Sequence, residues 1–146
     1  MRSRAFAGGR VLAGRLHGRG RAVAAACRRA EALVPKLSDP QFAIVTAFNC
    51  AEVAMDSGDI DKAKAGFNEA LRISRKANNA TYEANTELIM GQIDLDDRQW
   101  DSARTRLSRA AAMFVQAEVS TGEADAQALL ALCEEAVGNA AARDKA

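Results

Sequence analysis

The sequence has little of several residue types: 5% aromatic residues, one histidine, three cysteines and two prolines among 146 residues. Scarce aromatics with abundant alanine disfavour β-strands and favour closely packed helices. The single histidine, His17, has no second imidazole with which to form a zinc site and no pattern that would make it a general base. The cysteines Cys27, Cys50 and Cys133 are widely separated, which indicates a reducing compartment.

The sequence also lacks an apolar run near the ~20 residues that a membrane-spanning helix requires, so we expect a soluble, cytoplasmic protein. Residues 1–30 contain eight arginines and no acidic residue, whereas residues 31–146 contain twelve basic and nineteen acidic residues. An acid-free, arginine-rich start is typical of a mitochondrial targeting leader, and its arginines could also hold a phosphate backbone. Phe6 is the only aromatic residue among the first forty, so specific nucleic-acid recognition is not expected.

The chain contains an internal repeat, because residues 47–79 align without a gap on residues 87–119, forty residues later. Small and apolar residues coincide in this alignment: Ala51 with Gly91, Phe67 with Leu107 and Ala70 with Ala110. Such a period indicates stacked units that bury their apolar faces against their neighbours. We therefore predict an all-α fold, an α-solenoid of antiparallel helix pairs with roughly three pairs plus a closing helix.

Capping and turn residues place the helices of the repeat. Ser38-Asp39-Pro40 predicts a helix start at Pro40, and Gly58 predicts its end after Asp56. Further helices are predicted over about 60–76, 81–95 and 100–115, with Asn78-Asn79 as a turn. A last helix is expected from Ser120, where Glu123 completes a capping box, to Val137, with Gly138-Asn139 ending it.

The first forty residues fit the same period less well. They predict helices over about 4–17 and 21–34, with Gly18 in the turn between them and Pro35 ending the second. The chain is thus divided into three parts. Residues 1–39 are a degenerate first repeat or a basic leader, residues 40–139 are the repeat domain, and residues 140–146 are a frayed tail.

Each unit has a small residue in its first helix, a glycine in the turn, and alanine, a bulky apolar residue and alanine in its second helix. These residues are Ala51, Gly58, Ala63, Phe67 and Ala70 in one unit, and Gly91, Ala103, Leu107 and Ala110, with Arg98 at the turn, in the next. The pattern resembles the tetratricopeptide repeat, and its alanine- and arginine-rich style is similar to the tetratricopeptide segments of large bacterial signalling and regulatory proteins. The resemblance covers about residues 40–139 and implies protein binding rather than catalysis.

The resemblance also implies which residues bind the partner, because in this family the first helices of successive pairs line a concave groove. By register, the groove residues are Val45, Phe48, Asn49, Glu52 and Met55, followed by Asn85, Leu88, Ile89, Gln92 and Asp96. The set is apolar with acidic edges and predicts a protein or peptide partner. A carboxylate clamp is not expected, because Ile89 stands where such a clamp has a basic residue. Burial of these helix faces by a neighbouring repeat or a second subunit is the alternative explanation.

Other candidate sites have ordinary structural explanations. Four nearby acidic residues, Asp94, Asp96, Asp97 and Asp101, lack the loop glycine and distant glutamate of a calcium loop, and we expect a solvated turn that caps the helix at Trp100. Cys50 and Cys133 are expected to be small core residues, because they fall on alanine-rich helix faces. No catalytic, cofactor-binding or metal-binding residue is predicted.

Three functional hypotheses follow from these observations. The first is a non-catalytic scaffold that binds a partner protein or peptide, and a second copy of the chain is an economical partner because end helices present unpaired faces. The second is a sensing or regulatory fragment of a multidomain kinase or transcriptional regulator. The third is an organelle-targeted helical scaffold, mitochondrial if residues 1–30 are a leader.

Overall fold

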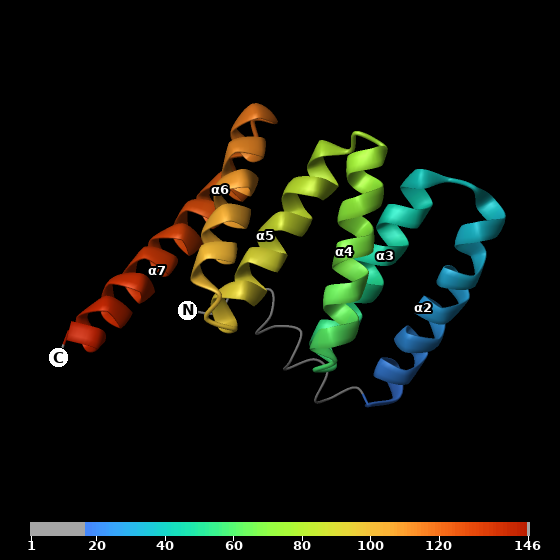
Figure 1. Cartoon of the computed structure of the whole chain (residues 1–146). Helices are drawn as coiled ribbons and strands as arrows, with labels where there is room; N and C mark the ends of the chain where they lie inside the picture. Colours follow the sequence, from blue (N-terminus) through green and yellow to red (C-terminus); the bar gives the residue numbers. More distant parts are fainter. Residues whose placement is uncertain (1–16, 146) are drawn as a thin grey trace. The chain divides into compact units, whose positions relative to one another are not determined.

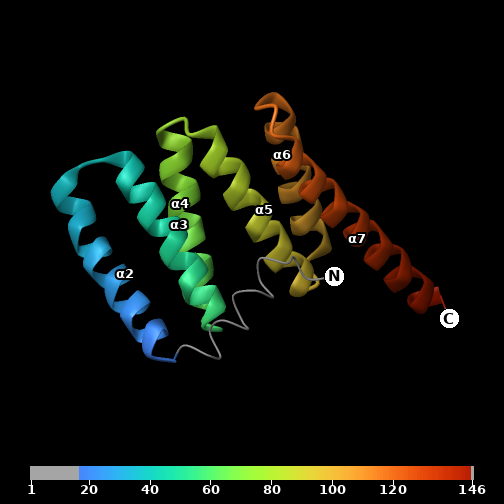
Figure 2. The same ribbon diagram turned by 180° about the vertical axis from the view of Figure 1, so that it is seen from behind.

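The computed structural model describes residues 17–145, and within this range it contains six α-helices and no strand. The helices are α2 (His17–Leu37), α3 (Pro40–Asp56), α4 (Ile60–Lys76), α5 (Ala80–Asp96), α6 (Trp100–Gln116) and α7 (Ser120–Lys145), as Figure 1 shows. Within each of the two units described below, consecutive helices run antiparallel, which Figure 2 shows from behind. The prediction of an all-α fold is confirmed.

The described residues form two compact units, residues 17–73 and residues 74–145. In the first unit, the rings of Phe48 on α3 and Phe67 on α4 pack edge to face with their centroids 5.6 Å apart. Ile44 and Ala63 are fully buried in the same unit. Burial of apolar surface is the main favourable term in folding, so these contacts hold α3 and α4 together.

The second unit has a core that joins α5, α6 and α7. One cluster contains Ala84, Ala110, Ala111, Phe114 and Ala126, and a second contains Ala103, Leu107 and Cys133. Leu88 and Leu130 pack against both clusters, which makes the core continuous. The predicted inward direction of Phe67 and Leu107 is confirmed, because both side chains are fully buried.

The turns that follow α3, α4, α5 and α6 share one backbone geometry. Each has a residue in the left-handed region: Gly58 at φ 86°, Asn78 at 55°, Arg98 at 60° and Glu118 at 57°. After α3, the Gly58 amide donates to the Met55 carbonyl at 3.0 Å and the Asp59 amide donates to the Ala54 carbonyl at 2.9 Å. This is the Schellman arrangement, which satisfies the last carbonyls of a helix. It recurs after the other three helices, so the helices that follow these four turns begin at residues 60, 80, 100 and 120.

Small residues allow the helices to approach closely where they cross. A Cβ added at Gly66 on α4 would lie 2.8 Å from the Cβ of Ala51 on α3. A Cβ at Gly91 on α5 would lie 2.7 Å from Cδ2 of Leu107 on α6. Real side chains do not pack this closely, so larger residues at either glycine would separate the helix pair.

Several predicted helix boundaries are wrong. α2 begins at His17, so Gly18 lies inside a helix rather than in a turn, and Pro35 also lies inside α2, which ends at Leu37. Proline lacks one amide donor. Because Pro35 lies so close to the end of α2, the loss of this one hydrogen bond does not end the helix there. The helix predicted over residues 4–17 otherwise lies outside the described residues.

The last helix is also longer than predicted. α7 continues through Gly138 and Asn139 to Lys145, because no proline follows and the alanines after Asn139 favour a helix. Arg143 and Lys145 in its last turn further stabilise the helix end. In a capping box the serine is the residue just before the helix. Ser120 is instead the first residue of α7, and Val119 precedes the helix.

Helix starts show which capping predictions hold. The Asp39 carboxylate accepts a hydrogen bond from the Gln41 amide at 3.0 Å, and Pro40 is the first helical residue, as predicted. The helix at Trp100 differs, because Gln99 precedes it and makes no side-chain capping bond. The predicted turn is solvated, because Asp96, Asp97 and Asp101 are exposed, but the prediction that an aspartate caps this helix is wrong.

Substitution of each of two glycines by alanine tests how much the left-handed turn constrains the residue at its centre. Neither Gly58 nor Gly138 has any atom within 4 Å of an added Cβ, so both substitutions are sterically free. Gly58→Ala should lower the free energy of unfolding by about 1 kcal/mol, because φ is left-handed there. Gly138→Ala should raise it by about 0.5–1 kcal/mol, because this glycine is helical. Urea unfolding of both variants checks the two signs, and equal signs would contradict this account.

Candidate functional site

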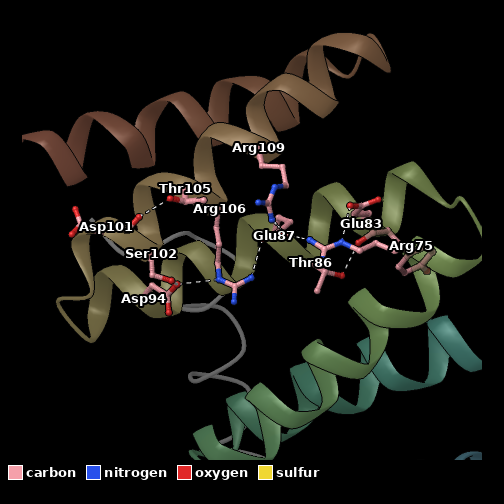
Figure 3. Close-up of polar contacts among 11 residues, drawn as sticks. Arg75, Glu83, Thr86, Glu87, Asp94, Asp101, Ser102, Thr105, Arg106 and Arg109 are labelled. Carbon is pink, nitrogen blue, oxygen red and sulfur yellow. Dashed lines mark hydrogen bonds and ion pairs between the residues drawn. The ribbon is translucent and has the colours of Figure 1, made fainter.

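A buried carboxylate on α5 is the centre of a charged network in the second unit. The Glu87 side chain is fully buried, and three arginines donate hydrogen bonds to it. Nη2 of Arg75 lies 2.6 Å from Oε1, Nη1 of Arg109 lies 2.9 Å from Oε1, and Nη1 of Arg106 lies 3.0 Å from Oε2. Figure 3 shows the three guanidinium groups converging on this carboxylate. The arginines thereby replace the water that Glu87 loses on burial.

Two more acidic residues complete this network, which we call the Glu87 cluster. Glu83 accepts a hydrogen bond from Nε of Arg75 at 3.0 Å, and Asp94 accepts one from Nε of Arg106 at 3.1 Å. The Ser102 hydroxyl also donates to Asp94 at 2.5 Å. Three arginines are thus balanced by three carboxylates, so the cluster carries no net charge for a ligand to neutralise. It ties the last turn of α4 to α5 and α6, and we interpret it as structural.

The first unit has a cavity where the second unit has the Glu87 cluster. The cavity has a volume of about 330 Å³ and lies among residues of α2, α3 and α4. Because α3 and α5 begin forty residues apart, as do α4 and α6, Ala47 corresponds to Glu87 and Gly66 to Arg106. Both Ala47 and Gly66 line the cavity. Small residues have thus left open the space that charged side chains fill in the second unit.

The charged residues of the cavity differ from those of the cluster. Glu31, Lys62 and Glu69 are its ionic lining residues. Glu69 stands where α6 has Arg109, so the sign of the charge is reversed at that position. Glu69 is an exposed partner of Arg72 at 2.7 Å, a contact within one helix that stabilises little. The remaining walls are largely apolar, with Val34, Ala65 and Ile73 among them.

The ten predicted groove residues divide between the two units. Val45, Phe48, Asn49, Glu52 and Met55 lie on α3 in the first unit, and Asn85, Leu88, Ile89, Gln92 and Asp96 lie on α5 in the second. Asn49 and Asp96 are exposed, Phe48 and Gln92 are buried, and the other six are half-buried. Phe48 and Leu88 also contribute to the packing inside their own units. The groove itself stays a prediction.

Glu52 is the groove residue with an unusual electrostatic environment. Its side chain is half-buried, and burial followed by the nearby negative charge of Asp56 raises the pKa of its carboxyl above the ordinary value. Within residues 17–145 no hydrogen bond or ion pair to Glu52 is present. An acid with a perturbed pKa and no compensating partner is a candidate for contact with another molecule.

The four clustered aspartates do not come together around one point. Asp94 belongs to the Glu87 cluster, whereas Asp96, Asp97 and Asp101 are exposed. Among the described residues, no group of three or more histidine, cysteine or acidic side chains is arranged to hold a metal ion. His17 is the first residue of α2, and its side chain lies outside the described part.

The cysteines occupy two kinds of environment. Cys133 is fully buried, as predicted for a core residue, and its thiol donates to the Trp100 carbonyl at 3.5 Å. Burial raises the pKa of the Cys133 thiol. Cys50 is only half-buried, as is Cys27, so the prediction of a core position holds for Cys133 and only in part for Cys50.

Comparison with known proteins yields no relative. No family model, no curated protein and no solved structure has a significant match to the chain. In addition, none of the helices within residues 17–145 is both long enough and apolar enough to cross a membrane.

Sequence reasoning identified Glu52 but missed the Glu87 cluster. A usable signal was present, because Glu83, Glu87 and Asp94 lie on one side of a helix and Arg106 and Arg109 are three residues apart on the next. Charges on consecutive helices are ordinarily solvated, so this spacing alone does not indicate burial. Whether these charges are buried depends on how α5 packs against α6.

Removal of the buried charge tests the structural role of the cluster. Glu87→Gln should lower the free energy of unfolding by about 2 kcal/mol, because three arginines lose their common counter-ion while remaining partly hydrated. The matched substitution Glu69→Gln, in the exposed pair with Arg72, should change it little. Chemical denaturation measures both. Equal effects of the two variants would show that burial of Glu87 has no special energetic weight.

The raised pKa of Glu52 predicts a pH dependence. Because the folded state disfavours the ionised carboxylate, Glu52 contributes most stability at low pH and loses it as the pH rises through its raised pKa. Glu52→Gln should therefore be more stable than the wild type at pH 7, and the difference should vanish well below pH 4.5, the ordinary value. Thermal unfolding across this pH range measures it.

A carboxyl with the opposite shift provides the control. Hydrogen bonds from Arg72 lower the pKa of Glu69, so this group contributes stability above the ordinary pKa of a glutamate and loses it as the pH falls. Because the pair with Arg72 is exposed, Glu69→Gln should alter the pH profile only slightly, and with the opposite sign. A Glu52→Gln profile parallel to the wild type would show that Glu52 is not strained in the folded protein.

Proposed function

We propose that this chain is a non-catalytic interaction module, a stack of tetratricopeptide-like helix pairs that binds a partner protein or peptide through α3. The observation that carries the proposal is Glu52, a half-buried carboxylate with a raised pKa and no ion-pair partner among the described residues. A partially dehydrated charge of this kind is stabilised when another molecule brings an opposite charge to it.

The residues around Glu52 define the surface that the partner would contact. Val45, Asn49 and Glu52 are spaced by four and three residues, so they form one stripe along α3. Val45 is half-buried and Asn49 is exposed. Apolar contact with Val45, a hydrogen bond to Asn49 and a cation near Glu52 together suit a protein segment that presents a lysine or arginine beside an apolar side chain.

The regularity of the helices supports the tetratricopeptide-like part of the proposal. Helices α3, α4, α5 and α6 each have 17 residues, and their starts are evenly spaced along the chain. Small residues lie at the helix crossings, Ala51 opposite Gly66 in one unit and Gly91 opposite Leu107 in the other. Repeated units of this kind commonly present extended surfaces to partners.

Site-specific photocrosslinking tests the proposal. A benzophenone amino acid at Asn49 should give a discrete crosslinked product in extract of the organism that makes the protein, identified by mass spectrometry. The same group at Asn68, an exposed asparagine on α4 of the same unit, is the matched control. Glu52→Lys should abolish the product at Asn49 by placing a like charge against the partner's cation.

The outcomes separate the possible partners. A product with a peptide of this chain identifies a second copy as the partner. The eight arginines of residues 1–30 could then supply the cation that contacts Glu52. A product with another protein identifies that protein. Equal labelling from Asn49 and Asn68, or a product insensitive to Glu52→Lys, would contradict the proposal.

A further inference from the structure

Helix α2 has an apolar side that no other described residue covers. Of the six large apolar side chains that are exposed among residues 17–145, three lie on α2: Val23 at 44%, Leu33 at 43% and Leu37 at 52%. Their spacing places them on one side of the helix, together with the half-buried Ala30. We call these four residues the α2 face.

Helix α7 has an uncovered apolar side as well, and it is made mostly of alanine. Ala124, Ala128 and Ala131 are exposed and follow one another at four and three residues, so they form one stripe. Leu132 lies beside them and is 38% exposed. These residues form the α7 face. Continuous exposed apolar surface is typical of a contact with another protein.

The internal repeat shows what the α7 face would meet. Forty residues earlier, the equivalent residues of α5 are Ala84, Leu88 and Gly91, and these residues contact α6. Ala84 shares a core cluster with Ala110 of α6, and Gly91 lies against Leu107 of α6. The α7 face is therefore the side with which α5 receives α6, left uncovered on α7.

The α2 face is the matching half of the same helix contact. Eighty residues later in the repeat, Val23 corresponds to Ala103 of α6 and Leu33 corresponds to Met113. Ala103 is fully buried, and Met113 packs against the core cluster that α6 shares with α5. The α2 face is thus the side with which α6 meets α5.

We propose that the α7 face of one copy of this chain packs against the α2 face of a second copy, in the way that α5 packs against α6 inside the second unit. Each copy has one face of each kind, so the contact is heterologous and copies associate head to tail. The inference does not depend on the proposed function, which places the partner on α3.

The charges of the two helices are complementary. Helix α2 contains five basic residues and one acidic residue, whereas the first twenty residues of α7 contain four acidic residues and no basic one. Opposite charges on two surfaces favour their association. One polar contact also falls in register, because Arg29 of α2 stands where α6 has Arg109, which donates to Glu87. Gln127 of α7 stands at the position of Glu87, and Glu123 lies one turn before it.

Residues 1–16 of the same chain are the competing occupant of the α2 face, and the repeat disfavours them. In register they would place Arg4 at the position where Ile44 and Ala84 are buried. Burial of a guanidinium group without a partner is costly. The α7 face has Ala124 at that position, so a second copy suits the α2 face better.

Two singly altered full-length chains test the inference, because each contact needs one α2 face and one α7 face. Leu33→Arg alters the α2 face and Ala128→Arg alters the α7 face, and both residues are exposed, so the fold should tolerate them. In light scattering, the mean mass of the wild type should rise with protein concentration. Each variant alone should be a monomer. An equimolar mixture should form a species of twice the monomer mass, because it retains one intact α7 face and one intact α2 face.

Ala32→Arg is the matched control, with the same added charge beside Leu33. Ala32 corresponds to Arg72 of α4 and Ala112 of α6, which are both exposed, so this variant should associate like the wild type. Circular dichroism verifies that every variant is folded.

Three results would overturn the inference. The first is a wild type that stays monomeric at every concentration, as expected if residues 1–16 or the α7 face of the same copy cover the α2 face. The second is association that persists in either variant alone. The third is an equimolar mixture that stays monomeric although the wild type associates. Crosslinking from Asn49 reports on α3 and tests the proposed function separately.

Discussion

Close contact between consecutive helices is the constraint on which the rest of the structure depends, and at three crossings of the described helices a glycine makes this contact possible. Gly66 meets Ala51, Gly91 meets Leu107, and Gly122 meets the ring of Phe114, where an added Cβ would lie 2.5 Å from a ring carbon. At such distances the apolar side chains beside each crossing are excluded from water. The buried alanines, the two phenylalanine rings of the first unit and the enclosed carboxylate of the second all follow from this proximity.

The two units make different use of equivalent positions. In the second unit, large ionic side chains occupy the space next to the helix crossing and neutralise one another, which fastens three segments of the chain together. In the first unit, Ala47 and Gly66 leave that space open, and cysteine appears at its edge. One helical framework thus supports a rigid ionic contact in one place and a small solvent-accessible space in another. A rigid ionic contact and a solvent-accessible cavity are difficult to combine at one position. In this chain the contact lies in the second unit and the cavity in the first.

Local signals predicted most helices well, and tertiary contacts explain what they missed. The bounds 40–56 and 60–76 were predicted correctly, because Pro40, Gly58 and the apolar spacing act within a few residues of the boundary they set. The ends of α2 and α7 were wrong, because proline and glycine were given more weight than the helix-favouring residues around them. Glu52 was placed among the candidate residues from its register. The arginines around Glu87 could not be predicted, since their positions depend on which helix faces meet.

The recurring turn has a consequence for how a chain of this kind can change in length. The four connections from α3 to α7 use the same three-residue path, whether the left-handed position holds Gly58, Asn78, Arg98 or Glu118. The conformation of the turn is therefore set by the backbone. The residue at the left-handed position changes only the free energy of that conformation. Genetic duplication or loss of a complete helix-and-turn pair would leave each remaining junction with its original geometry, whereas an insertion of one residue would rotate every later apolar stripe away from its neighbour.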